Sequence, residues 1–186
     1  IKGFEMTTAT IPQHKPSTKW MILALAGLTN AITVAVPGMA MSVLFAEIST
    51  DLNLTLTQVG IVWGIGSVTA IITSLVGGGI SDKVGPRKML IFGAIGTGLF
   101  GAMRGLSNDF TFLIIATLVY SFFMPLITMN GLKASRLWFP PKLLGSAGGL
   151  LSMGMALGFF LSSRFSATVV SPAVGGWRNT LIVYGI

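Results

Sequence analysis

Charged residues are scarce in this chain of 186 residues, because Asp, Glu, Lys and Arg together make up 9% of it. Soluble domains carry about a quarter charged residues, and hydrophobic residues reach 52% here. The chain is therefore too apolar to fold in water. The same figures exclude disorder, which requires low hydrophobicity and high charge. We expect an all-α integral membrane protein.

Cysteine is absent, and the single histidine, His14, lies near the N-terminus. The absence of Cys excludes disulfides, thiolate nucleophiles and Cys-ligated metals. An intramembrane hydrolase needs a nucleophile with its base, or a metal with its ligands, and nothing in the sequence suggests either. We expect no enzyme activity, no metal and no cofactor.

Apolar runs follow one another along the chain, and a membrane-crossing helix needs about 20 such residues. The first run is far longer than the core of a signal peptide, so we interpret it as a true first helix after a tail of residues 1–19. The sixth run is still apolar at Ile186, so we expect a fragment with an incomplete sixth helix. The runs are 20–46, 59–80, 89–103, 110–132, 143–163 and 177–186.

Basic residues are unevenly shared between the two sets of loops. The tail, the second loop and the fourth loop hold nine of them, and the other loops hold three, Arg104, Arg164 and Arg178. The positive-inside rule then puts the N-terminus in the cytoplasm. It also explains the net charge of +7 without nucleic acid as a partner. The short loops favour a prokaryotic inner membrane.

Local signals fit this map of spans. Thr55 and Gln58 have capping-box spacing at the start of the second span. Pro37 and Pro125 lie at similar depths in the first and fourth spans, which points to two inverted triplets of helices, as in transporters. Proline is also simply common in membrane helices, so this repeat stays one of two interpretations.

One loop has a specific pattern, in the stretch from Gly78 to Lys88. Asp82 is unusual there, because the C-terminal end of a helix disfavours a carboxylate. It should have a partner, either a cation or the N-terminus of another helix. Gly85 permits a tight turn with positive φ. The residues that carry the pattern are Gly78, Asp82, Lys83, Gly85, Arg87 and Lys88.

This order resembles the signature loop of the major facilitator superfamily, G-xxx-D-(R/K)-x-G-R-(R/K), with Pro86 at the usual Arg position. Trp138-Phe139-Pro140-Pro141 and Gly176-Trp177-Arg178 are similar to later loops of the family. The resemblance implies an N-terminal six-helix half (3+3 inverted repeat) of a transporter that works by alternating access. It also implies that Asp82 is a conformational latch, which caps a helix of the C-terminal half that this chain lacks.

The family resemblance further implies that spans one, two, four and five line a substrate cavity. Polar residues share one helical face on each of these spans, although Ser and Thr in membrane helices often bond their own backbone instead. Asn30 is the strongest candidate, because a mid-membrane amide is costly without a partner. The cavity candidates are Asn30, Thr33, Trp63, Ser67, Thr117, Ser121, Met124, Thr128 and Ser152.

Ionisable residues are expected at the ends of the spans and not deep within them. Arg104 and Arg164 should snorkel outward from outer ends. The arginine that the family's drug/proton antiporters carry in span four is missing from the stretch around Tyr120. The substrate could therefore be neutral, amphipathic, or an anion held by the other half, moved by symport, antiport or facilitated transport.

The sequence is also compatible with two other functions. A complete six-span protein could work as a homodimer, with a second copy in place of the second half. A non-transporting membrane receptor or scaffold would show no alternating access. The expected partners are a small-molecule substrate, the lipid bilayer and the missing C-terminal half.

Overall fold

The computed structural model describes residues 16–186, with side chains from residue 19 onward except those of 137 and 138. The described chain is helical throughout, without a strand. Five helices in it are long and apolar enough to cross a membrane, as expected of an all-α membrane protein. Most of the predicted tail, including His14, lies outside the described residues.

The first span is a nearly continuous helix with one irregular turn. It consists of α1 (Pro16–Asn30), a π-helical turn (Ala31–Ala35), α2 (Val36–Val43) and α3 (Phe45–Asp51). Pro37 lies in the first turn of α2, where its missing N–H is tolerated. Helix α3 extends beyond residue 46, where the first predicted span ends.

The second and third spans are α4 (Leu56–Val84) and α5 (Pro86–Met103). The capping box at Thr55 and Gln58 is present, as the sequence predicts. Gly85 joins the two helices with φ of 92°, a conformation that glycine adopts at no steric cost. Helix α5 runs into a 3₁₀ turn, Arg104–Leu106.

The fourth span is α6 (Phe110–Trp138), which begins at Asp109, whose side chain accepts a hydrogen bond from Phe112 N at 2.8 Å. It continues through Pro125, so the proline-associated break of the first span has no equivalent here. The two prolines therefore lie in different local backbone, and the repeat that they pointed to stays a prediction.

The fifth span begins with a 3₁₀ turn (Pro141–Leu143) and continues as α7 (Leu144–Phe165), a π-helical turn (Ser166–Val170) and α8 (Ser171–Val174). Gly175 and Gly176 then turn the chain with φ of 85° and 118°. Helix α9 (Trp177–Gly185) follows.

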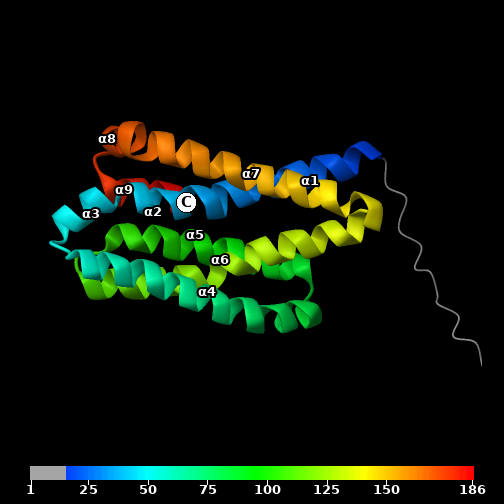
Figure 1. The fold of residues 1–186 in the computed structure, drawn as a ribbon, viewed down its shortest axis with the longest axis horizontal. Helices are drawn as coiled ribbons and strands as arrows, with labels where there is room; N and C mark the ends of the chain where they lie inside the picture. The colour runs from blue at the N-terminus through cyan, green and yellow to red at the C-terminus, as the bar shows by residue number, and fades with distance from the viewer. Residues whose placement is uncertain (1–15) are drawn as a thin grey trace, which may run out of the picture.

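The helices form two groups that run along the long axis of the bundle (Figure 1). One group holds α1, α2 and α7, and the other holds α4, α5 and α6, with α9 packed against α5 and α2. The core has its largest apolar cluster near α3, where Leu44, Ile48, Leu113 and Leu181 are buried. We call this the α3 end of the bundle, and the opposite end the α1 end.

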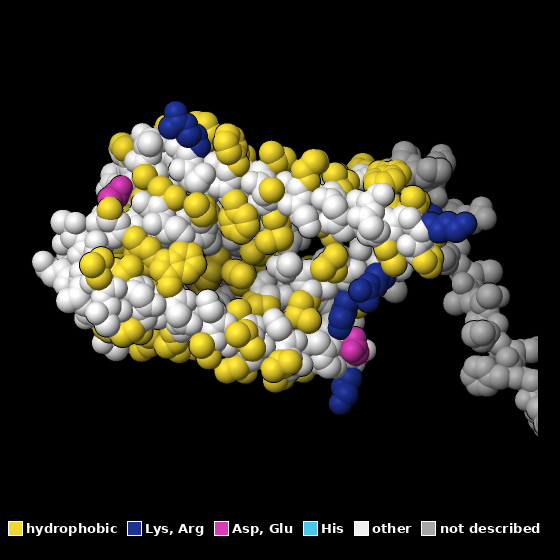
Figure 2. Space-filling view, viewed as in Figure 1, with side chains coloured by type: hydrophobic (Ala, Val, Ile, Leu, Met, Phe, Trp, Pro, Cys, Tyr) yellow, Lys and Arg dark blue, Asp and Glu magenta, His cyan; other side chains and the backbone are white. Residues whose placement is uncertain are grey.

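Close helix contacts depend on glycine. A Cβ at Gly154 of α7 would lie 2.6 Å from the Gly27 carbonyl oxygen of α1, and one at Gly158 would lie 2.9 Å from that of Ala31. Small residues of this kind let membrane helices approach each other closely. Lys and Arg side chains gather mainly at the α1 end in the view of Figure 2, which fits the predicted orientation of the N-terminus.

Candidate functional site

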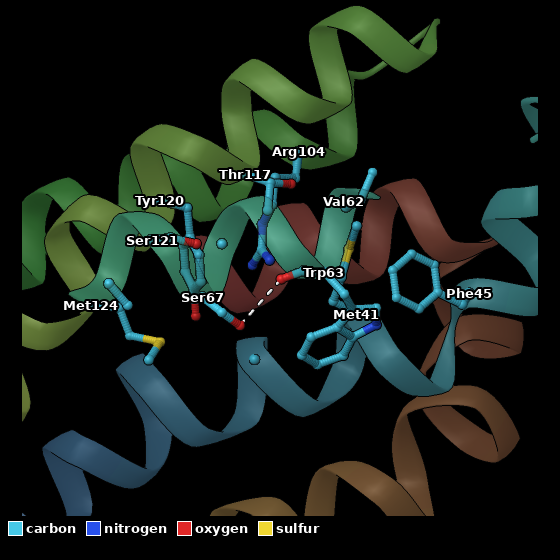
Figure 3. Close-up of a pocket in the computed structure, with 13 residues that line it drawn as sticks. Met41, Phe45, Val62, Trp63, Ser67, Arg104, Thr117, Tyr120, Ser121 and Met124 are labelled. Atoms are coloured by element: carbon cyan, nitrogen blue, oxygen red, sulfur yellow. Dashed lines mark hydrogen bonds between the residues drawn. The ribbon is translucent and has the colours of Figure 1, made fainter. Parts of the chain in front are cut away.

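A pocket of about 180 Å³ lies between α2, α4, α6 and the turn after α5. Five of the predicted cavity residues line it, and Figure 3 shows their side chains around the cavity: Trp63, Ser67, Thr117, Ser121 and Met124. The polar faces that we predicted on α4 and α6 therefore line the same cavity. The other lining residues include Gly38, Met41, Phe45, Gly66, Arg104 and Tyr120.

Arg104 is the residue that sequence reasoning placed wrongly. Its side chain is 2% exposed, and it points into the pocket (Figure 3) instead of snorkelling outward. The guanidinium carbon lies 3.7 Å from the centre of the Tyr120 ring. Arg104 begins the 3₁₀ turn after α5, and its guanidinium packs on the Tyr120 ring of α6. The third span thus supplies an arginine next to Tyr120, in the part of the fourth span that has no arginine of its own.

Polar atoms around this guanidinium have few partners within the described structure. Arg104 Nη2 donates a long hydrogen bond of 3.5 Å to the Pro37 carbonyl. Arg104 Nε, Thr117 Oγ1 and the Tyr120 hydroxyl are buried without a partner among the described residues. Three residues that line the pocket therefore each have a buried hydrogen-bond donor without a partner among the described residues.

Carboxylates do not compensate this cation in the described part of the chain. The two ion pairs among the described residues, Lys133 with Asp82 and Arg178 with Asp51, do not involve Arg104. A buried charge without a counter-charge is costly. The arrangement therefore suits an anionic group at the pocket, supplied by a ligand or by another part of the protein.

The pocket has a buried floor and an exposed rim. Arg104, Tyr120 and Thr117 are buried, whereas Trp63 on α4 is 49% exposed. Trp63 packs against Phe45 with ring centres 5.9 Å apart, and Ser67 donates to the Trp63 carbonyl at 3.4 Å (Figure 3). A solute would meet an aromatic edge first and the cation deeper inside.

Four predicted cavity residues lie outside this pocket. Asn30 lines a second cavity of about 250 Å³ with Gly131. Its Nδ2 donates to the Ala26 carbonyl at 3.0 Å, and its buried Oδ1 has no partner in the described structure. Thr33 donates to its own helix at the Thr29 carbonyl, 2.7 Å away. Thr128 is half-buried and Ser152 is exposed on α7.

At the signature loop, side-chain contacts connect the end of α4 to α6. Lys133 Nζ lies 2.7 Å from Asp82 Oδ1 and 3.0 Å from the Gly78 carbonyl oxygen, and Ser81 hydrogen-bonds Asn130. Lys133, 51 residues away, supplies the cation that was one of the two expected kinds of partner for Asp82, and the role of Asp82 as a latch on a second half stays a prediction. Lys83, Arg87 and Lys88 are exposed, and Asp82 keeps 72% of its side chain exposed.

Comparison with known protein families matches residues 21–186 to the Major Facilitator Superfamily. Among curated proteins, the chain is 26% identical over 170 residues to a probable L-galactonate transporter of Escherichia coli. It is 26% identical over 173 residues to a probable sulfoacetate transporter of Cupriavidus necator. It is 28% identical over 142 residues to a hexuronate transporter of Bacillus subtilis.

These matches cover most of this chain but a minor part of each relative. They include 91%, 93% and 76% of this chain, and 36%, 40% and 33% of the three relatives, in the same order. The chain therefore spans about a third to two-fifths of the length of the curated relatives it matches.

Proposed function

This chain belongs to the major facilitator superfamily, and we propose that it forms the N-terminal half of a transporter that moves a small organic anion across a membrane. Transport by alternating access would bring the pocket of this half to each side in turn. Arg104 would hold the anionic group of the solute.

The observation that carries this proposal is the buried guanidinium of Arg104 at the floor of the pocket. Among the described residues it has no carboxylate partner. Charges inside a membrane protein are expensive, so they usually pair or mark a substrate path. A carboxylate or sulfonate solute would neutralise Arg104 and accept hydrogen bonds from its donors.

Other features of the pocket support a small solute with hydroxyl groups. Its volume is about 180 Å³, and Thr117 and Tyr120, whose hydroxyls are buried without a partner among the described residues, both line it. The relatives are named for L-galactonate, sulfoacetate and hexuronate, and each of these compounds carries a carboxylate. The similarity is low and partial, so these names support the class of solute and not one compound.

A second interpretation of Arg104 is that a carboxylate from the rest of the transporter pairs with it. The exposed rim at Trp63 and Ser67 would be covered by a second bundle, which could supply such a group. A second copy of this chain could cover the same rim, as in the homodimer interpretation. Under either arrangement, Arg104 would control helix packing and not solute binding.

The test is uptake by the full-length transporter in proteoliposomes, with L-galactonate, galacturonate and sulfoacetate as probes and galactitol as the neutral comparison. Arg104→Met should raise the KM for the transported anion by about 10- to 100-fold, because hydrogen bonds to charged groups contribute about 1.5–3 kcal/mol. The KM of Arg104→Lys should lie between those of the unmodified transporter and Arg104→Met. Lysine keeps the positive charge but cannot bind a carboxylate with two parallel hydrogen bonds.

Arg164→Met is the matched control, because it removes the same charge from an exposed position on α7. An unchanged KM in Arg104→Met would refute the anion site and favour a structural pairing of Arg104. Transport of galactitol with none of the three anions would refute the class of solute. A protein that binds an anion but never releases it across the bilayer would be a receptor.

A further inference from the structure

A polar cluster at the α3 end joins the first, third and sixth spans. Asp51 Oδ2, in the last turn of α3, accepts a hydrogen bond from Trp177 Nε1 at 3.1 Å and forms an ion pair with Arg178 Nη1. Arg178 Nη2 then donates to the Ser107 carbonyl oxygen at 3.0 Å. One guanidinium therefore links a carboxylate to the backbone three residues after Arg104.

Helix α9 also lies directly on the turn that carries Arg104. A Cβ added at Gly105 would overlap the Arg178 carbonyl oxygen and lie 2.8 Å from Ile182 Cγ1. Further along, a Cβ at Gly98 would lie 2.8 Å from the Gly185 carbonyl oxygen. The first turn of α9 is thus the surface against which the Arg104 turn rests.

Arg104 itself has little to fix its direction apart from this turn and the Tyr120 ring. Its hydrogen bond to Pro37 is long, at 3.5 Å, and its Nε has no partner in the described structure. The position of its backbone therefore decides where the guanidinium lies. The backbone at Ser107 is held by Arg178, and Arg178 is held by Asp51.

We infer that Asp51 and Arg178 form a positioning pair for Arg104, so that they control anion affinity without touching the solute. This inference rests on the proposed function, since it assigns a role through Arg104. A planar guanidinium suits the task, because it can bind a carboxylate and a carbonyl at the same time. Displacing a binding group by about 1 Å can cost up to about a hundredfold.

A double-mutant cycle in the full-length transporter tests the inference, with uptake of the transported anion as the readout. Asp51→Asn should raise the KM by up to about fivefold, with a smaller change in maximal rate, because the anion-binding group is displaced and a partly exposed ion pair supports no larger effect. Arg178→Lys should act in the same direction, since a point charge cannot keep both contacts. Added to Arg104→Met, neither change should raise the KM further.

Glu47→Gln is the control, because Glu47 accepts a hydrogen bond from Ser171 at 2.7 Å at the same end of the bundle without a contact to the Arg104 turn. It should leave the KM within about twofold, because the lost hydrogen bond joins Glu47 to Ser171 and not to the Arg104 turn. Thermal unfolding in detergent should be similar for Glu47→Gln and Asp51→Asn, so that a loss of fold is not mistaken for a loss of affinity.

The outcomes separate the two proposals. If Arg104→Met leaves the KM unchanged, the anion site fails, whatever Asp51→Asn does. If Arg104→Met raises the KM and Asp51→Asn does not, the positioning role alone is refuted. Additive effects of Asp51→Asn and Arg104→Met would also refute it, because the two residues would then act independently.

Discussion

The guanidinium of Arg104 lies over the face of the Tyr120 ring, with the guanidinium carbon 3.7 Å from the ring centre. Both side chains are buried. Arg104 lies in the turn after α5 and Tyr120 lies on α6, and these two helices pack closely together. An aromatic face attracts a cation and is most effective where water is excluded. The ring therefore offsets part of the cost of burying Arg104.

Two substitutions of Tyr120 distinguish the role of its aromatic ring from the role of its hydroxyl. Tyr120→Leu removes the aromatic face and should raise the anion KM by about 2- to 30-fold, the range expected for a cation–π contact of about 0.5–2 kcal/mol. Tyr120→Phe keeps the face and should change the KM by less than about threefold, because the hydroxyl has no partner in the described structure. Equal losses in both variants would assign the hydroxyl, and not the ring, to solute binding.

Glycine at position 66 sets the width of the pocket. A Cβ there would lie 2.9 Å from Ser121 Oγ, so Gly66→Ala should move Ser121 and add a methyl group to the cavity. We expect about tenfold lower uptake efficiency for a hexose-sized anion such as galacturonate, within the range for one extra methyl in a pocket. The smaller sulfoacetate should be affected less. Gly64→Ala, with nothing within 4 Å, is the control, and an equal loss there would contradict a steric effect.

Much of the fold was predictable because the signals are local. Runs of apolar residues mark spans in any bilayer protein, and the box at Thr55 and Gln58 needs only residues three apart. The shared face of Ser67, Thr117 and Ser121 was predicted by helical periodicity alone, and the structure brings these residues to one pocket.

The missed residues depend on contacts between distant segments. Position along the third span puts Arg104 near a membrane surface, but its side chain packs inward on Tyr120 of the fourth span. Asp82 and Lys133 are 51 residues apart, and their pairing follows from the packing of α4 on α6. The sequence did hold one signal for the burial of Arg104. Gly101 and Gly105 flank it, and glycines leave room for a neighbouring helix to pack over the arginine.

Stability of the first group of helices should depend on Gly154. Gly154→Ala forces α7 away from α1, because the added Cβ would lie 2.6 Å from the Gly27 carbonyl oxygen. Overpacking of this kind costs about 1–3 kcal/mol, so the unfolding temperature in detergent should fall by several degrees. Gly149→Ala on the same helix meets nothing within 4 Å and should not lower it. Equal unfolding temperatures in the two variants would show that α1 and α7 tolerate separation.

The pair of Asp82 and Lys133 gives the test of the proposed latch. The two side chains are 72% and 29% exposed, so the ion pair itself is expected to contribute less than about 1 kcal/mol. If Asp82 also holds the second half, Asp82→Asn should shift the inward/outward balance, whereas Lys133→Met should shift it less, because the carboxylate remains.

The measurement is the rate at which a maleimide labels Ser67→Cys from each side of the membrane in the full-length transporter, in a background without other cysteines. Asp82→Asn should change the ratio of the two rates by up to about fivefold, the equivalent of about 1 kcal/mol. Arg136→Met, an exposed cation nearby on α6, should leave the ratio unchanged. An unchanged ratio in Asp82→Asn would limit Asp82 to joining α4 and α6. A larger shift in Lys133→Met than in Asp82→Asn would assign the latch to the lysine.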